Sequence, residues 1–225
     1  MKIKYTTITN NELLDAYPQV HYDLNYYYSI GNIESDKKAL SEKINNSIVN
    51  KTYYKDHWEN GFIAKLKSHL DIQEIYPTTA GLVPNFSGVI KLREDGNFKT
   101  ELHFYKSLIN DYFTIEILEL NTHKKVVHPI LGEKTIVGVD TITVSPIGKY
   151  KDLFHQVLKC ISQEYETSKF IPYVFDTIRL EGLNLKYKQE KNCTISSALF
   201  QKYSVYNDTI EVIGDVEFGL EILKN

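Results

Sequence analysis

The chain has 225 residues, of which 42% are hydrophobic and 24% charged, the composition of an ordinary globular protein. No apolar run approaches the roughly 20 residues that a membrane helix needs, and the N-terminal segment MKIKYTTITNNELL has no apolar signal core. We therefore expect a cytoplasmic protein that does not enter a membrane. In that compartment we expect its two cysteines, Cys160 and Cys193, to stay reduced.

The net charge of -3 is distributed unevenly along the chain. From Asp208 to the C-terminus, five acidic residues stand against one lysine, whereas the rest of the chain holds 25 Lys and Arg against 24 Asp and Glu. The negative excess therefore lies in the C-terminal segment. A protein that binds nucleic acid usually carries a basic stripe for the phosphates, and because the sequence shows none, we expect no nucleic-acid partner.

Residues 10–75 carry apolar residues at helical spacing. Pro18 suits the first turn of a helix that has Val20 and Leu24 on its inner face. Two further apolar stripes predict two more helices: Leu40, Ile44 and Ile48 form one stripe, and Trp58, Phe62, Ile63, Leu66 and Leu70 form the other. These helices predict a helical subdomain over 1–78 that packs on the remainder of the chain.

From about residue 86 the period changes from 3.6 to 2, which predicts an antiparallel meander of about four strands. Its first turn is predicted at Glu94-Asp95-Gly96. A three-residue loop here places Leu92 opposite Phe98 and keeps the apolar faces together, whereas a two-residue Asp95-Gly96 loop mixes them. A second turn is predicted over 121–125, and a last strand over 135–144.

A long amphipathic helix and further strands complete the predicted fold. Apolar residues recur at offsets of 3, 4, 7 and 8 from Tyr150 to Tyr165, the pattern of a helix that lies on a sheet. A strand over 178–187 and a short helix from Thr194 follow. Helices first, a meander second, then a helix and strands indicate an α+β fold, with 79–225 as a domain of antiparallel sheet plus helix.

The segment from Thr209 to Asn225 alternates apolar and acidic residues with a period of two. Such alternation predicts a strand with one buried face and one solvent-exposed face. The exposed face would present four carboxylates, those of Glu211, Asp215, Glu217 and Glu221. If Gly214-Asp215 forms a turn instead, Asp215 leaves this ladder but the segment stays acidic.

Tyrosine is frequent, with 17 in the chain and four of them between positions 22 and 28. Tyrosine is favoured at interfaces because it covers a large area at little cost in entropy and keeps a hydroxyl for hydrogen bonding. Four tyrosines so close together cannot all face one way on a helix. We expect Tyr27 to pack inward, which leaves Tyr22 and Tyr26 as candidate partner-binding residues.

No motif in the sequence fixes a reaction. The histidines lack metal-ligand spacing, the glycines do not group into a phosphate loop, and neither cysteine has a histidine close in sequence. We therefore predict no metal, no cofactor and no catalytic residue.

A site assembled from distant residues is the alternative. Histidines on the predicted sheet, His103 and His128, with Glu101, Glu116 or Asp140, could serve a hydrolase or a transferase. Asp140 shares its strand face with apolar residues, so we expect it to be at least partly buried.

These observations favour a non-enzymatic, cytoplasmic protein-binding module of bacterial type. An immunity-type inhibitor fits the pattern, because its carboxylates would cover a basic surface of a toxin and speed association with it. The predicted partner is therefore another protein. The sequence leaves the oligomeric state and the identity of that partner open.

Overall fold

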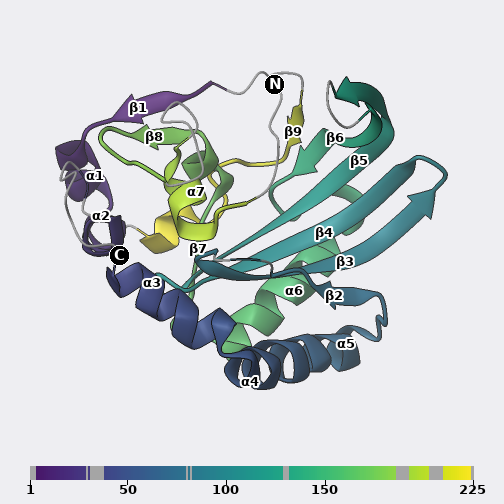
Figure 1. Cartoon of the computed structure of the whole chain (residues 1–225), viewed down its shortest axis with the longest axis horizontal. Helices are drawn as coiled ribbons and strands as arrows, with labels where there is room; N and C mark the ends of the chain where they lie inside the picture. Colours follow the sequence, from purple (N-terminus) through teal and green to yellow (C-terminus); the bar gives the residue numbers. More distant parts are fainter. Residues whose placement is uncertain are drawn as a thin grey trace.

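The structure is a computed structural model that describes residues 4–28, 30, 38–79, 81, 83–128, 132–185, 193–202 and 210–223. For 122–128 and 132–137 it describes the backbone alone. The fold is α+β, as predicted: a mostly antiparallel sheet carries helices on both of its faces (Figure 1).

Seven strands form the main sheet, in the order β2-β3-β4-β5-β6-β9, with β7 added beside β5. Neighbours from β2 to β6 pair antiparallel, whereas β7 and β9 join in parallel. The strand bounds are β2 (Ile75–Pro77), β3 (Asn85–Asp95), β4 (Phe98–Ser107), β5 (Tyr112–His128), β6 (Gly132–Thr143), β7 (Lys169–Phe170) and β9 (Glu211–Ile213). A separate parallel pair consists of β1 (Thr6–Ile8) and β8 (Ile178–Leu180), so the strand predicted over 178–187 ends early.

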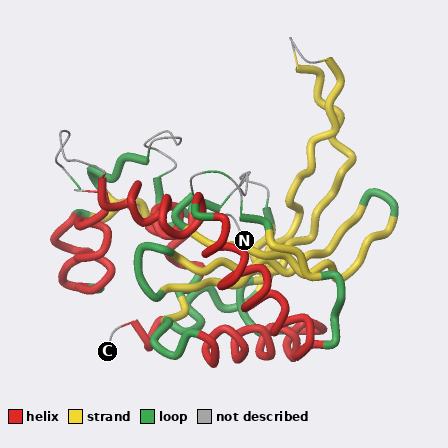
Figure 2. Tube along the Cα trace, turned by 60° about the horizontal axis from the view of Figure 1, so that its bottom comes forward, coloured by secondary structure: helices red, strands yellow, loops and turns green. Residues whose placement is uncertain are grey.

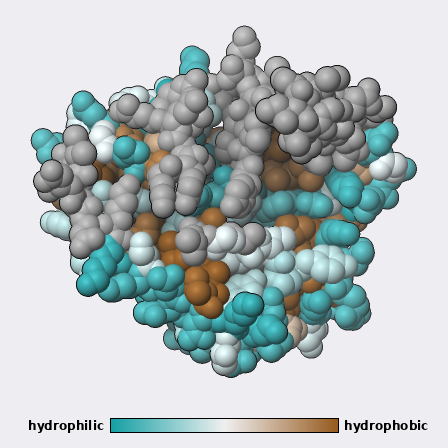
Figure 3. All heavy atoms as spheres, in the orientation of Figure 1, coloured by the Kyte–Doolittle hydropathy of each residue, from teal (hydrophilic) through white to brown (hydrophobic). Residues whose placement is uncertain are grey.

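One sheet face is covered by helical segments from the N-terminal third and by α6 (Lys151–Glu164). The N-terminal segments are α3 (Lys38–Ile44), η1 (Asn45–Val49), α4 (Lys51–Tyr54), η2 (Lys55–Ile63) and α5 (Ala64–Leu70). Trp58 lies at the centre of this core, stacks on Phe62 and Phe86, and donates its indole N–H to the carbonyl of Ser87 at 3.0 Å. Figure 3 shows the opposite, outward side of these segments, along the lower edge of the view, as mostly hydrophilic.

The other sheet face is covered by α1 (Asn10–Ala16), α2 (Pro18–Tyr28), η4 (Tyr173–Asp176) and α7 (Ile195–Phe200). Val20 and Leu24 of α2 are buried in this second core, together with Tyr105 and Tyr112 from the sheet. The helices of the N-terminal third thus contribute apolar side chains to cores on both faces of the sheet. The division at 78/79 remains a prediction.

The β3–β4 hairpin differs from the predicted turn. Asp95 pairs with Phe98, so the loop consists of Gly96 and Asn97, and Gly96 adopts φ +58°. The prediction that Leu92 lies opposite Phe98 is wrong, because the two-residue turn places Asp95 opposite Phe98. Leu92 itself is skipped where the register shifts between Lys91 and Arg93. The extra residue that the sequence pattern assigned to the loop instead forms a β-bulge within β3.

The turn predicted over 121–125 is also wrong. β5 continues through it to His128, and β5 and β6 run out from the body as a two-stranded arm (Figure 2). The polar residues that indicated a turn belong to this projecting arm, where a strand has no core to bury against and needs no apolar face.

Candidate functional site

The predicted acidic ladder exists only at its start. Glu211 belongs to the three-residue strand β9, but the chain leaves the sheet at Gly214, which adopts φ +105°. The N–H of Asp215 then donates to Ser145 Oγ at 2.8 Å, and the N–H of Glu217 donates to the side chain of Asp215 at 2.9 Å. The strand predicted beyond Ile213 is therefore wrong, and the alternative with a turn at Gly214-Asp215 holds.

The alternation of apolar and acidic residues has another cause in the structure. The segment after the turn crosses apolar surface: Phe218 packs against Phe154 and Phe170, and Leu223 is buried in the second core. It ends in a short 3-10 helix, η6 (Leu220–Leu223). From Val216 to Leu220 the turns still place apolar side chains inward, so this part of the alternation does not require a strand. In η6 the spacing becomes three, so Leu223 is buried and Ile222 is 47% exposed.

All four predicted partner-binding acids are nevertheless exposed: Glu211, Asp215, Glu217 and Glu221. No described lysine or arginine lies within 4.0 Å of the carboxylates of Glu211, Asp215 or Glu217. Their negative charges are therefore offset only by solvent and by distant groups.

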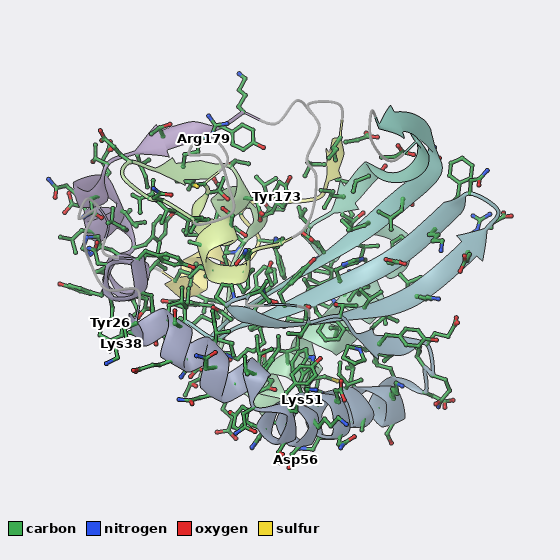
Figure 4. The ribbon with its side chains drawn as sticks, in the orientation of Figure 1. Tyr26, Lys38, Lys51, Asp56, Tyr173 and Arg179 are labelled. Atoms are coloured by element: carbon green, nitrogen blue, oxygen red, sulfur yellow. The ribbon has the colours of Figure 1, made fainter. Side chains whose placement is uncertain are left out.

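The two predicted tyrosines lie one turn apart on α2 and are both well exposed, Tyr22 at 62% and Tyr26 at 69%. Tyr27 lies partly buried against the second core and meets the ring of Tyr26 edge-on at 4.9 Å. Figure 4 shows Tyr26 at the margin of the molecule.

Tyr26 also lines a surface cavity of about 630 Å³, here called the tyrosine cavity. Three other tyrosines line it, which are Tyr27, Tyr53 and Tyr165. Its walls come from α2, from α3 and η1, and from the loop between β4 and β5. The volume lies within the range of sites that bind small molecules or a partner's side chains. The sequence pointed to Tyr26 but not to a cavity, because the walls are far apart in the chain.

Four charged groups line the tyrosine cavity: Asp23, Lys43, Lys106 and Asp111. The Lys106 side chain is 8% exposed, and its ammonium donates to Asp111 Oδ1 at 3.1 Å. Burial lowers the pKa of Lys106, against the opposing effect of Asp111. The pKa of Asp111 is itself lowered, first by a hydrogen bond from the Thr167 hydroxyl.

A second polar group lies on the sheet face beneath α7 and η4. His103 Nε2 and Glu101 Oε2 are 2.9 Å apart, both partly buried, and this contact lowers the pKa of Glu101. Tyr105 continues the row on the same face of β4, with its hydroxyl 3.4 Å from His103 Nδ1. The structure thus brings together His103 and Glu101, two of the residues that the sequence offered for an assembled site.

Glu116 lies directly opposite His103 on β5 and is almost completely buried. Its carboxylate accepts from the ammonium of Lys202 at 3.1 Å, and Lys202 also donates to Asp176 at 3.0 Å. Burial raises the pKa of Asp176, whereas the two carboxylates outweigh the burial of Lys202 and raise its pKa. The other oxygen of Glu116, Oε1, has no hydrogen-bond partner among the described residues.

The sequence did not predict this buried ion cluster. Lys202 and Asp176 come from α7's C-terminal flank and from η4, and a lone lysine in a polar stretch normally indicates a solvated position.

The remaining members of the predicted sheet site do not join it. Asp140 is exposed, which contradicts its expected burial, because the pairing of β5 with β6 skips it between Val139 and Thr141. The side chain of His128 lies outside the described residues. Across the part of the chain that is described, no group of three or more His, Cys, Asp or Glu side chains is placed to hold a metal.

The two cysteines, Cys160 and Cys193, are both free. In the described segments, no helix has the length and apolar character needed to cross a membrane. Comparisons with protein families, with curated proteins and with solved structures gave no match.

Proposed function

We propose that this chain is a non-enzymatic, cytoplasmic protein-binding module that covers a basic surface of another protein, as an immunity-type inhibitor covers a toxin. The observation that carries the proposal is the set of four exposed carboxylates in the last 15 residues, of Glu211, Asp215, Glu217 and Glu221. Three of them have no cationic partner within the described structure. A basic partner protein would supply the missing positive charges. Its attraction to these carboxylates would act over a distance of about 10 Å at moderate salt.

The contacts that fix this segment on the body of the protein support the same proposal. Leu223 and Phe218 anchor it in the cores, and the hydrogen bond from Asp215 to Ser145 fixes its turn. Preorganised charges bind more tightly than charges on a mobile tail, because less conformational entropy is lost on association.

A charge-reversal pair of variants tests the proposal. In the first variant, Glu211, Asp215, Glu217 and Glu221 all become lysine. Each change replaces one negative charge with one positive charge, so the net charge of the chain moves from -3 to +5. The control carries the same four-fold reversal at exposed acids elsewhere, namely Asp56, Glu74, Asp152 and Glu166.

Only the first variant is expected to lose binding to a basic candidate partner protein, measured by isothermal titration calorimetry. Equal losses in both variants would show that net charge alone matters and would contradict a local acidic surface.

A second function is favoured by the contact between Glu101 and His103. A carboxylate that orients an imidazole is the basic arrangement of general acid–base catalysis, so a hydrolase or transferase site is the alternative. The test is turnover of ester, phosphodiester and peptide substrates by the wild type. Activity that disappears in His103→Gln but persists in His57→Gln, which alters an exposed histidine, would favour the enzyme.

A further inference from the structure

Asp23 stands out among the charged groups of the tyrosine cavity because, among the described residues, three neutral side chains hold its carboxylate in place. Its Oδ2 accepts from Asn110 Nδ2 at 2.8 Å and from the Tyr112 hydroxyl at 2.6 Å, and its Oδ1 accepts from Gln19 Nε2 at 3.1 Å. No described lysine or arginine lies within ion-pair distance of it. The hydrogen bonds fix the position of the carboxylate, and its charge is left without a cation.

The other charges of the cavity do not supply that cation. Lys106 is held by Asp111 at 3.1 Å, so the buried ammonium is offset by this half-exposed carboxylate. Lys43 is exposed, and the field of an exposed ammonium is weakened by water several-fold more than the field of a partly buried carboxylate. Asp23 is therefore a partly buried carboxylate of the cavity that no described cation offsets within ion-pair distance.

The aromatic walls favour a particular kind of cation. Tyr26 is 69% exposed and Tyr53 41% exposed, so both present ring surface to the cavity opening. A guanidinium is planar and weakly hydrated, stacks on tyrosine faces and donates to a carboxylate, whereas an ammonium is held more strongly by water.

We propose that the tyrosine cavity receives an arginine side chain of the partner protein, with its guanidinium between Tyr26 and Asp23. This inference rests on the proposed function, since it names one contact that a basic partner would make. It assigns to α2 the anchoring contact, while the C-terminal acids supply attraction at longer range. Arginine is among the residues most often found at the centre of binding energy in protein interfaces.

The test titrates N-acetyl-arginine amide into the isotope-labelled full chain and follows the backbone amide signals of Tyr26, Tyr27 and Asn110 by NMR. We expect saturable shifts at these positions. N-acetyl-lysine amide should bind about threefold or more weakly, because it cannot stack as a plane.

Three variants locate the contact. Asp23→Asn keeps an acceptor for Tyr112 but removes the charge, and Tyr26→Ala removes the exposed ring; each should weaken arginine binding about threefold or more. Tyr76→Ala is the matched control, since Tyr76 is a 43% exposed tyrosine that does not line the cavity and has no proposed part in binding. If Asp23→Asn fails to fold, Tyr26→Ala and its control still decide the question.

Arginine shifts that persist in Tyr26→Ala, or a response to N-acetyl-glutamate amide or inorganic phosphate instead of arginine, would overturn the inference. The latter result would identify Lys43 and Lys106 as an anion site. Because the probe binds the isolated chain, this outcome is separate from whether the C-terminal acids bind a partner.

Discussion

Replacing Lys202 by methionine tests whether the buried ion cluster holds the second sheet face together. The substitution keeps a long, flexible side chain but removes the ammonium between Glu116 and Asp176, whose side chains are 1% and 6% exposed. Two carboxylates would then lie in the interior without the ammonium that binds them both.

The magnitude follows from the two short contacts, 3.1 Å to Glu116 and 3.0 Å to Asp176. At an effective dielectric constant of about 20, each pair contributes roughly 5 kcal/mol of attraction, most of which offsets desolvation. Removing one partner of a buried pair typically costs about 3–5 kcal/mol, because the remaining charge stays desolvated. For a chain of this length, that corresponds to a fall in Tm of about 2–4 °C for each kcal/mol.

Urea unfolding of Lys202→Met at pH 5 and pH 8 provides the assay. Burial already raises the pKa of Asp176 in the folded protein, and without the ammonium of Lys202, which opposes this rise, the Asp176 carboxylate takes up a proton more readily. Protonation relieves the repulsion between the two carboxylates in the folded state, so the destabilisation should be smaller at pH 5 than at pH 8. Lys65→Met is the control, because the Lys65 ammonium is 66% exposed in its pair with Glu164 and such surface pairs contribute about 0–1 kcal/mol. A loss in Lys202→Met no larger than in Lys65→Met, or one independent of pH, would refute the reasoning.

Two further predictions concern the interior. Among the described residues, burial raises the pKa of eight tyrosines, most strongly at Tyr28, Tyr105, Tyr112, Tyr165 and Tyr173. These five should stay protonated in the folded chain while their unfolded counterparts ionise near pH 10, so stability should fall above that pH. Absorbance at 295 nm should show incomplete tyrosine ionisation until the chain unfolds. A smooth titration of all 17 tyrosines with circular dichroism unchanged would contradict their burial. Gly88→Ala should lower the free energy of unfolding by about 1–3 kcal/mol, since the added Cβ would lie 2.3 Å from the Phe104 ring. The control is Gly138→Ala, whose Cβ meets nothing closer than 3.7 Å and which should therefore cost much less stability. Equal losses of stability in guanidinium unfolding would show that the close approach at Gly88 is unimportant.

The α+β class could be predicted because it depends on periodicities that extend over many residues. The apolar residues that predicted the α2 helix, Val20 and Leu24, are buried, as are Trp58 and Phe62 of the third apolar stripe. The placement of Gly96 in the first hairpin turn followed from local chemistry, since a positive φ favours glycine.

The register of that hairpin and the path after Ile213 could not be read from the same patterns. A bulge between Lys91 and Arg93 changes the strand pairing without changing the hydrophobic alternation nearby. After Gly214, turns place the apolar residues inward as far as Leu220, as a strand would, so this part of the pattern fits both structures. The 3-10 helix then buries Leu223 and exposes Ile222, against the alternation.

The candidate sites depend on contacts between distant residues, which limits what a single sequence reveals. Glu101 and His103 were identifiable because they lie two residues apart on one strand face. Lys202 and Glu116 are separated by 86 residues, and the tyrosine cavity joins α2 to the β4–β5 loop. Only the fold brings these groups together.

Binding of the chain to a basic candidate partner protein, measured by calorimetry at 50 and 300 mM salt, tests the proposed function most directly. A complex should form that weakens with salt, and reversing the charges of Glu211, Asp215, Glu217 and Glu221 should reduce its affinity at least about tenfold, while the control reversal of four other exposed acids should not. Absence of a complex, or an affinity unchanged by the C-terminal reversal, would contradict the proposal that the acidic C-terminal surface binds a protein partner.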